Sequence, residues 1–380
     1  MGVGSLGDTT LTGVRAILGP LFDDWLSSPI SINNSEPNFR LVDIGRYIAR
    51  RLLLAVFVLL GVLVITFVIS HSFGDPIYAW LGKSAALHPN LVKLYVAKYH
   101  LDAPIYTQFY YYVVGLLQGN LGVSPSRGFT PVITVIEQTL PYTLQIAFFA
   151  IIMTLVMGVA FGILASFYHK KPLDAGIRGF YLAGYSSPPF FVGLVLLILL
   201  VYFLHWLPSG GAATITIQAP HPITGIPMLD SLIEGNFAYL QSALIHVILP
   251  SLTLAVTTFG VVTRILRSSV LDVMHSNFIR TARAKGVDER TVFLSHGLRN
   301  GLIPVVTVSS LVVTYLLTGT VFVENIFAYP GMGQYVVQAL LASDYPGILA
   351  TTLIFASLIV LTNLSADILY VVVDPQIRYS

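Results

Sequence analysis

The reactive side chains of this sequence do not form a recognisable catalytic or metal-binding motif. The chain has nine histidines and no cysteine, and no two histidines have the His-Glu-x-x-His spacing of a zinc-binding helix. A Gly-x-Ser-x-Gly turn, which would present a serine nucleophile, is also missing from the sequence. We therefore expect no catalytic residue and no metal site, which argues against a membrane protease or transferase.

One short stretch is similar to part of a nucleotide-binding loop. Gly82-Lys83-Ser84 has the last residues of a phosphate-binding loop, but that loop also requires a glycine five residues before Gly82. Ile77 occupies that position. We expect no ATP site and no bound cofactor in this chain, and we do not expect it to be an enzyme.

A basic, glycine-containing stretch runs from Arg264 to Asn300 and is called the basic segment below. Long apolar stretches flank it on both sides, which predicts a loop at the cytoplasmic face. A short helix over Asp272–Arg283 is expected to end at Gly286, since glycine accepts the left-handed backbone conformation. Binding of a protein partner and anchoring to anionic lipid headgroups are both open roles for its charges. Seven of the chain's twenty Lys and Arg residues lie here: Arg264, Arg267, Arg280, Arg283, Lys285, Arg290 and Arg299.

The basic segment is expected to lie between membrane-spanning helices. Of the 380 residues, 55% are hydrophobic and only 10% are charged, whereas soluble domains carry about 25% charged residues. The expected fold class is all-α, a polytopic membrane helical bundle with six transmembrane helices. The expected spans are Leu52–Ile69, Thr143–Phe167, Phe180–Leu204, Leu244–Val262, Leu302–Val323 and Ile348–Val372.

The distribution of positive charge predicts the orientation. Sixteen of the twenty Lys and Arg residues fall on the side that holds both termini, the loop over residues 168–179 and the basic segment. Positive charge favours the cytoplasmic side, so we expect a multi-pass plasma-membrane protein, in contact with lipid, with both termini in the cytoplasm. The basic residues show no pattern typical of nucleic-acid binding.

The remaining segments lie outside the spans. Residues 1–45 form an expected cytoplasmic extension, either an amphipathic surface helix or a loosely ordered tail, and residues 46–380 form the transmembrane domain. An extracytoplasmic insertion is expected over residues 71–142, with further outer segments at 206–242 and 324–347.

Ionisable side chains within the spans are few. Asp367 lies near Asn363 in the last span, and His246 and Glu324 lie near span ends. Ion-coupled transporters usually carry such groups on their pathway, so we expect the energy for transport to come from another subunit. A self-powered secondary transporter or a channel is the alternative.

Hydroxyl and amide side chains within the spans are candidates for a solute pathway. Helix-packing hydrogen bonds are the alternative role for such groups. The candidates are Ser186, Ser187, Thr257, Thr258, Thr314, Thr318 and Asn363, with Pro188 and Thr253 beside them.

The basic segment resembles the coupling loop of ABC importer permeases of the dipeptide/oligopeptide/nickel family. The resemblance rests on the run Phe278 to Gly286 (FIRTARAKG), the run Ser295 to Asn300 (SHGLRN) and Pro304. Importer permeases generally have Glu-Ala-Ala where this chain has Arg280, Thr281 and Ala282, and the peptide branch usually shows the sequence found here. Matching pieces elsewhere extend the resemblance over roughly residues 45–380: FGDP at 73–76, LDAP at 101–104, QGNLG at 118–122, LPYTL at 140–144, YPGMG at 329–333, DYP at 344–346 and DPQIR at 374–378.

The resemblance implies a permease subunit with six helices, a cytoplasmic coupling helix and an extended first extracytoplasmic loop. The implied partners are a second homologous permease, two ATP-binding subunits that carry ATP and Mg, and an extracytoplasmic solute-binding protein. Peptides and oligosaccharides are both open as cargo, and nickel is less favoured because no His or acidic cluster lines a span. The implied ATPase-coupling residues are Arg280, Thr281, Ala282, Arg283, Lys285 and Gly286.

Overall fold

The computed structural model describes residues 41–72, 89–100 and 102–373 of the chain. It divides into two compact units, Met1–Arg50 and Arg51–Ser380, and the architecture below is that of the second unit. The described part of the first unit is the beginning of helix α2 (Leu41–Ser72). The expected N-terminal extension falls almost wholly on residues outside the described ranges and stays a prediction, while residues 41–45 are the beginning of α2.

The described part of the chain is mostly helical, as expected, with a long loop at residues 204–226. A short antiparallel hairpin of two-residue strands, β1 (Val123–Ser124) and β2 (Thr130–Pro131), is the only sheet among the described residues. The helices after α2 are α4 (Pro89–Tyr99), α5 (Ile105–Leu117), the short η2 (Pro125–Arg127), α6 (Val132–Phe167), α7 (Pro172–Ser186), α8 (Pro189–Leu196), the π-helix η3 (Leu197–Phe203), α9 (Pro227–Glu234), α10 (Phe237–Met274), α11 (Asn277–Ala284), α12 (Glu289–Thr291), the π-helix η4 (Val292–Leu298), α13 (Arg299–Gly301), α14 (Ile303–Ile326), α15 (Met332–Ala342) and α16 (Tyr345–Val373).

Four described helices are long and apolar enough to cross a membrane, namely Ala49–Ser70 within α2, α6, α10 and Tyr345–Ala366 within α16. Two bent helix pairs raise the number to six if each counts as one span. They are Pro172–Ser186 with Pro189–Phe203, bent by 113°, and Glu289–Val306 with Leu311–Ile326, bent by 54°. Counted in that way, four single helices and two bent pairs match the six predicted spans, and the number of spans stays a prediction.

The third predicted span, Phe180–Leu204, is wrong as a single helix. Ser187 has an extended backbone (φ −94°, ψ 135°) and separates α7 from α8. Pro188 follows it directly, and a residue before proline is disfavoured in the helical conformation. Pro189 then occupies the first turn of α8, where its missing N–H costs nothing. The proline pair thus turns one expected span into two helices.

Two other spans extend further than predicted. α6 begins at Val132 instead of Thr143 and contains Pro141 in its interior, so residues 132–142 of the predicted insertion belong to this helix. α10 runs from Phe237 to Met274, so the first part of the basic segment is a continuation of this helix rather than a loop.

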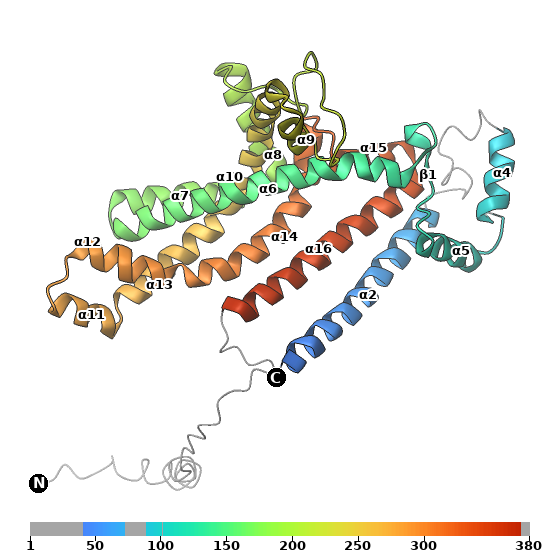
Figure 1. Cartoon of the computed structure of the whole chain (residues 1–380). Helices are drawn as coiled ribbons and strands as arrows, with labels where there is room; N and C mark the ends of the chain where they lie inside the picture. Colours follow the sequence, from blue (N-terminus) through green and yellow to red (C-terminus); the bar gives the residue numbers. More distant parts are fainter. Residues whose placement is uncertain (1–40, 73–88, 101, 374–380) are drawn as a thin grey trace, which may run out of the picture. The chain divides into compact units, whose positions relative to one another are not determined.

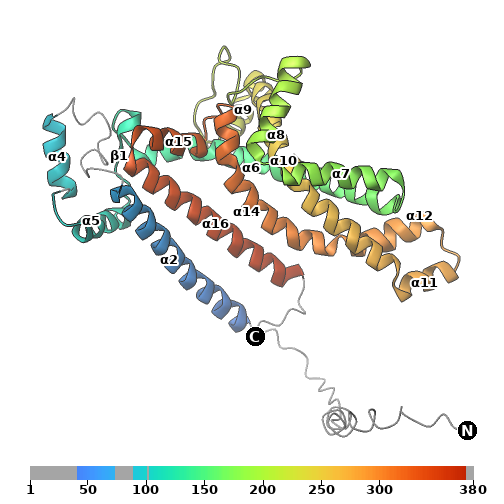
Figure 2. The ribbon, with the colours of Figure 1, turned by 180° about the vertical axis from the view of Figure 1, so that it is seen from behind.

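Helices α6 and α10 run side by side and form the centre of the second unit (Figures 1 and 2). Small residues allow this approach. A Cβ placed on Gly158 would lie 2.5 Å from the Cβ of Val262, and one placed on Gly162 would lie 2.8 Å from a methyl carbon of Leu266. Thr154 and Thr258 add a hydrogen bond of 2.8 Å between the two helices. These small residues thus serve helix packing, as such residues commonly do in membranes.

Helix α15 is fixed at both ends by side chains from other elements. At its start, the N–H of Gln334 donates to the buried carboxylate of Glu324 (3.0 Å) and the N–H of Met332 donates to Thr143 (2.8 Å). At its end, the buried Asp344 accepts hydrogen bonds from both Ser124 and Ser126, in the stretch that joins β1 to η2. The hairpin, α6 and α14 therefore all hold α15 in place.

Candidate functional site

The basic segment begins as the last turns of α10 and then breaks. Ser276 is extended (φ −71°, ψ 158°) and is the N-cap residue of α11. The predicted helix start at Asp272 is therefore wrong, because Asp272 still belongs to α10 and α11 begins at Asn277. The sequence gives no glycine or proline signal at this break.

The predicted end of the short helix is confirmed. Gly286 has a left-handed backbone (φ +78°). Its N–H donates to the carbonyl of Arg283 (3.0 Å), and the N–H of Val287 donates to that of Ala282 (3.3 Å). These two bonds are the Schellman pattern that closes a helix C-terminus. Glycine at this position lets the chain reverse immediately after α11.

An ion pair spans this reversal. The guanidinium of Arg283 donates to Glu289 through Nη2 (2.5 Å) and Nε (3.0 Å), and its hydrogen bond to Glu289 raises the pKa of Arg283. Asp288 accepts from the N–H of Thr291 (3.0 Å), which caps the following helix, and hydrogen bonds from Thr291 lower the pKa of Asp288. The side chain of Arg283 is thus paired within the turn that follows α11.

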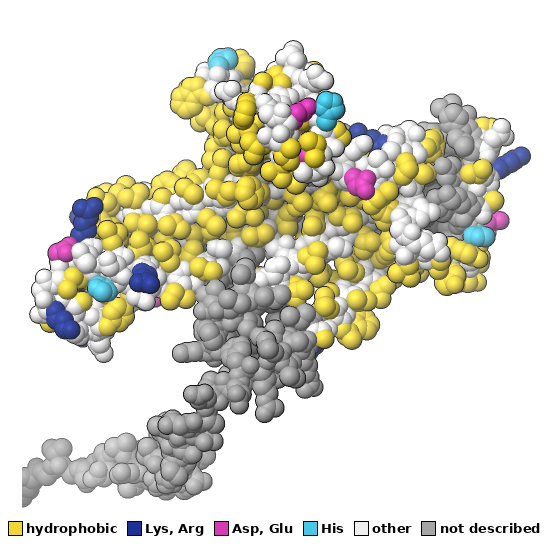
Figure 3. Space-filling model, in the orientation of Figure 1, with side chains coloured by type: hydrophobic (Ala, Val, Ile, Leu, Met, Phe, Trp, Pro, Cys, Tyr) yellow, Lys and Arg dark blue, Asp and Glu magenta, His cyan; other side chains and the backbone are white. Residues whose placement is uncertain are grey.

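The other predicted coupling residues lie mostly on the surface. Arg280, Thr281, Lys285 and Gly286 are exposed and Ala282 is half-buried. Ile279 is completely buried and holds α11 against the rest of the segment, whereas its neighbour Phe278 is 49% exposed. Figure 3 shows basic side chains gathered at the end of the molecule that carries α11 and α12. α11 therefore presents a surface that is basic and partly aromatic.

The part of the chain that follows α12, in η4 and α13, packs back against α10 at two glycines. A Cβ on Gly297 would lie 2.7 Å from the sulfur of Met274, and one on Gly301 would lie 2.5 Å from a methyl of Val270. Val292 and Phe293 are buried beside them. Gly297 belongs to the run that carries the resemblance, but the sequence did not indicate this packing role for it.

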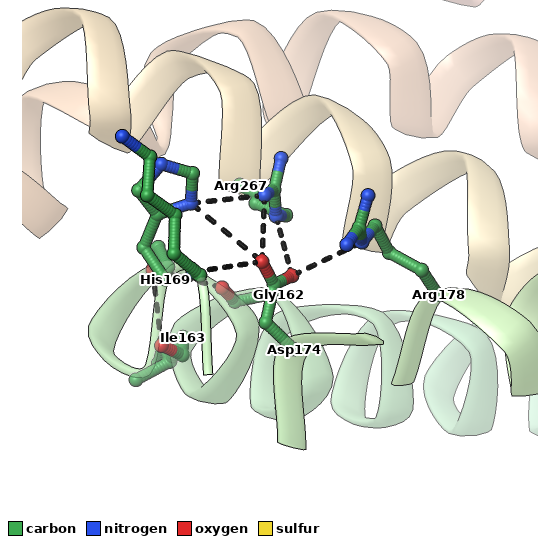
Figure 4. Close-up of polar contacts among 8 residues, drawn as sticks. Gly162, Ile163, His169, Asp174, Arg178 and Arg267 are labelled. Atoms are coloured by element: carbon green, nitrogen blue, oxygen red, sulfur yellow. Dashed lines mark hydrogen bonds and ion pairs between the residues drawn. The ribbon is translucent and has the colours of Figure 1, made fainter. Parts of the chain in front are cut away.

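A polar cluster missed by the sequence analysis ties α10 to α7 (Figure 4). Asp174 of α7 is 1% exposed and accepts two hydrogen bonds of 2.8 Å from Arg267 of α10. Arg178 lies 3.5 Å from the same carboxylate, and His169 accepts from Arg267 at 3.0 Å. Asp174 and Arg267 lie 93 positions apart, so no local pattern relates them.

The candidate pathway residues are not brought together in one place. Thr253, Thr257 and Thr258 are buried in α10 and donate to carbonyls of their own helix. Ser186 and Ser187 lie at the bend between α7 and α8.

Three further candidates lie on α14 and α16. Thr314 donates to Asn363 (2.9 Å) across these two helices, and Thr318 is exposed on α14. A role of any of the candidates in a pathway stays a prediction. Among the described residues no group of three or more His, Asp or Glu side chains is placed to hold a metal ion.

Two family models match the sequence. The model described as binding-protein-dependent transport system inner membrane component matches residues 158–379, and its N-terminal counterpart matches residues 44–147.

Relatives with curated names match nearly their whole length. The probable D,D-dipeptide transport system permease protein DdpB of Escherichia coli (strain K12) is 39% identical over 323 residues, 85% of this chain and 94% of the relative. The oligopeptide transport system permease protein AppB of Bacillus subtilis (strain 168) is 36% identical over 334 residues, 88% of this chain and 99% of the relative. Among solved structures, one titled as inward facing conformations of the MetNI methionine ABC transporter is 14% identical with a TM-score of 0.49, covering 64% of this chain and 97% of that one.

Proposed function

The chain belongs to the peptide family of ABC importer permeases, and from this premise we propose that it forms half of an ATP-driven translocation pathway for peptides. The family membership and the apolar helices both support a multi-pass protein of the inner membrane. The partners in the proposal are a second homologous permease, two ATP-binding subunits and an extracytoplasmic solute-binding protein. Both termini and the basic segment lie in the cytoplasm in this proposal.

The geometry of α11 is the observation that carries the coupling role. A short helix with a buried anchor, an exposed basic face and a fixed C-terminal turn follows directly on the long helix α10. Such a rigid projection suits docking into a groove of an ATP-binding subunit, whose closure would displace it as a body. In this proposal Arg280, Thr281, Ala282, Lys285 and Gly286 face the ATP-binding subunit, and Arg283 shapes the turn through Glu289.

The names of the relatives support peptides as cargo. The two described above are named for D,D-dipeptide and oligopeptide transport. The oligosaccharide alternative from the sequence gains no support from these names. Selection of the peptide is assigned in our proposal to the solute-binding protein, with the half-exposed Thr314 and the exposed Ser186, Thr318 and Asn363 as candidate pathway groups of this chain.

Purification and reconstitution test the proposal. The tagged chain is expressed with its chromosomal neighbours, solubilised mildly and reconstituted into liposomes. Copurification of an ATP-binding protein and a second permease, with peptide uptake that requires ATP and the binding protein, supports the proposal. Uptake by the chain alone, driven by an ion gradient, would establish the self-powered alternative.

A further inference from the structure

Asp174 is a buried carboxylate that none of the predicted sites uses. It lies in the first turn of α7, and both of its oxygens accept hydrogen bonds from the guanidinium of Arg267 in α10, each 2.8 Å long (Figure 4). A two-pronged contact between arginine and carboxylate fixes orientation as well as distance. The pair therefore restrains sliding and rotation of the two helices against each other.

The same carboxylate also orders the turn between α6 and α7. The N–H of Lys170 donates to Asp174 (3.2 Å), and Lys170 has a left-handed backbone (φ +62°). His169 in this turn accepts from Arg267. One buried carboxylate thus connects the α6–α7 turn, α7 and α10.

Arg267 lies in the last part of α10, which ends at Met274, shortly before α11 begins at Asn277. Farther along, α7 and α10 remain in close contact. A Cβ on Gly260 would lie 3.0 Å from the Cβ of Tyr181, and one on Gly184 would overlap the carbonyl oxygen of Val256. A displacement of the α11 end of α10 would therefore reach α7 through this packing and, nearest to α11, through the Asp174–Arg267 pair.

We propose that Asp174 and Arg267 are positioning residues that make α7 move as one body with the end of α10, so that displacement of α11 reaches the bend between α7 and α8. The inference rests on the proposed function, in which α11 receives the motion of an ATP-binding subunit. The exposed Ser186 and the half-buried Ser187 lie at that bend, where a movement of α7 relative to α8 would change the shape of the proposed translocation pathway. The competing role for the pair is charge compensation needed only for folding.

The test uses the complete importer in liposomes and measures peptide uptake per ATP hydrolysed. Asp174→Asn alone leaves the partly buried Arg267 without its carboxylate, and Arg267→Gln alone leaves the buried Asp174 with only Arg178 at 3.5 Å, so each should lower the yield of the complex. The double variant removes both charges and keeps amides of similar size, so the complex should assemble. We expect its uptake per ATP to fall about fivefold or more. Arg267→Lys keeps the positive charge but cannot make the two-pronged contact. This variant should assemble better than Arg267→Gln and should show only part of the wild-type uptake per ATP.

Arg264→Gln is the matched control, because Arg264 is an exposed arginine one turn earlier on the same helix. The Arg264→Gln variant should keep the wild-type uptake per ATP hydrolysed. A double variant that assembles and keeps the wild-type ratio would overturn the inference and leave charge compensation as the role of the pair. A wild-type complex without ATP-dependent uptake would instead overturn the proposed function, and the inference with it.

A second measurement is independent of uptake. The chain has no cysteine, so Ala175→Cys on α7 and Ser268→Cys on α10, both at exposed positions, can carry spin labels without other changes. The distance distribution should be narrow with and without ATP in the otherwise unchanged chain and should broaden in the double variant. Equally narrow distributions in both would contradict the proposed restraint.

Discussion

Arg283 and Glu289 face each other across the turn at Gly286, joined by two hydrogen bonds of 2.5 and 3.0 Å. Both side chains are substantially exposed, at 42% and 64%, so solvent weakens the attraction between them. The pair therefore contributes more to the direction of the turn after α11 than to the stability of the protein.

Neutralising either partner should loosen α11. Arg283→Gln and Glu289→Gln are each expected to speed hydrogen exchange of the α11 amides. The double variant should be no faster than either single variant, because all three lack the same pair. High salt should shrink the difference from the wild type. Arg290→Gln, an exposed neighbour, is the control, and additive effects in the double variant would show that the two residues act separately.

Gly286→Ala should damage coupling while the permease remains assembled. A Cβ added at Gly286 meets no other atom within 4 Å, but the φ of +78° is unfavourable for a residue with a side chain, at a cost of roughly 1–2 kcal/mol. We expect ATP hydrolysis with reduced uptake, a smaller defect for Gly286→Asn, and a larger one for Gly286→Glu. Gly179→Ala is the control, since that glycine also has open space and has no left-handed backbone. Wild-type uptake by Gly286→Glu would be incompatible with the proposed role of α11.

Gly158→Ala should lower the thermal stability of the solubilised protein. Its Cβ would lie 2.5 Å from that of Val262, and overpacking of this kind costs about 1–3 kcal/mol. Gly61→Ala in α2 is the matched helical control, because nothing lies within 4 Å of the added Cβ. Equal melting temperatures of the two variants would mean that α6 and α10 do not pack as closely as described.

Shortening Glu324 to aspartate should rescue alanine substitutions at Gly331, before α15, and at Gly333, within α15, to different extents. A Cβ on Gly331 would collide with the carboxylate of Glu324, whereas a Cβ on Gly333 would lie 2.5 Å from the backbone of Val321 as well as 2.9 Å from that carboxylate. Glu324→Asp withdraws the carboxylate, so it should partly rescue the expression and melting temperature of Gly331→Ala. It should not rescue Gly333→Ala to the same extent. Equal rescue of both would place the collision elsewhere.

The loop before α9 should loosen at acid pH. Burial by itself raises the pKa of Asp230, but hydrogen bonds from the side chain and N–H of Thr224, both 2.6 Å long, bring that pKa below its usual value. The carboxylate therefore adds stability above the unfolded pKa of about 4, and this stability is lost as the pH falls through the lowered value. The protection of residues 224–234 against hydrogen exchange, measured relative to the intrinsic exchange rate at each pH, should fall over that range.

Asp230→Asn provides the control for this acid response. The variant should be less protected against exchange than the wild type near neutral pH and should show little further loss of protection at acid pH. A wild-type acid response that persists unchanged in Asp230→Asn would assign the effect to another group.

The sequence predicted the parts of the fold that depend on composition and on local backbone preference. The apolar segments marked the spans because membrane helices need long apolar runs, and Gly286 marked the end of α11. Helix extensions such as Val132 to Pro141 were missed because their mixed polarity is typical of a loop, and the break at Ser276 has no glycine or proline.

Contacts between distant residues could not be predicted in the same way. The pairing of Asp174 with Arg267 depends on the approach of α7 to α10, and that approach depends in turn on small residues such as Gly184 and Gly260. No spacing within the chain encodes such a pair. The buried polar contacts around Glu324 and Asp344 were missed for the same reason.

The length of α10 has a mechanical consequence. Its 38 residues correspond to roughly 57 Å at 1.5 Å per residue, nearly twice the hydrocarbon thickness of about 30 Å. Where α6 packs closest to it, at Gly158 and Gly162, α10 contributes Val262 and Leu266. Leu266 lies eight residues before the end of α10 at Met274 and 29 residues after its start at Phe237. A tilt of α10 about this contact would therefore move the Phe237 end farther than the end that carries α11, so a small displacement of α11 would correspond to a larger one at the opposite end of the helix.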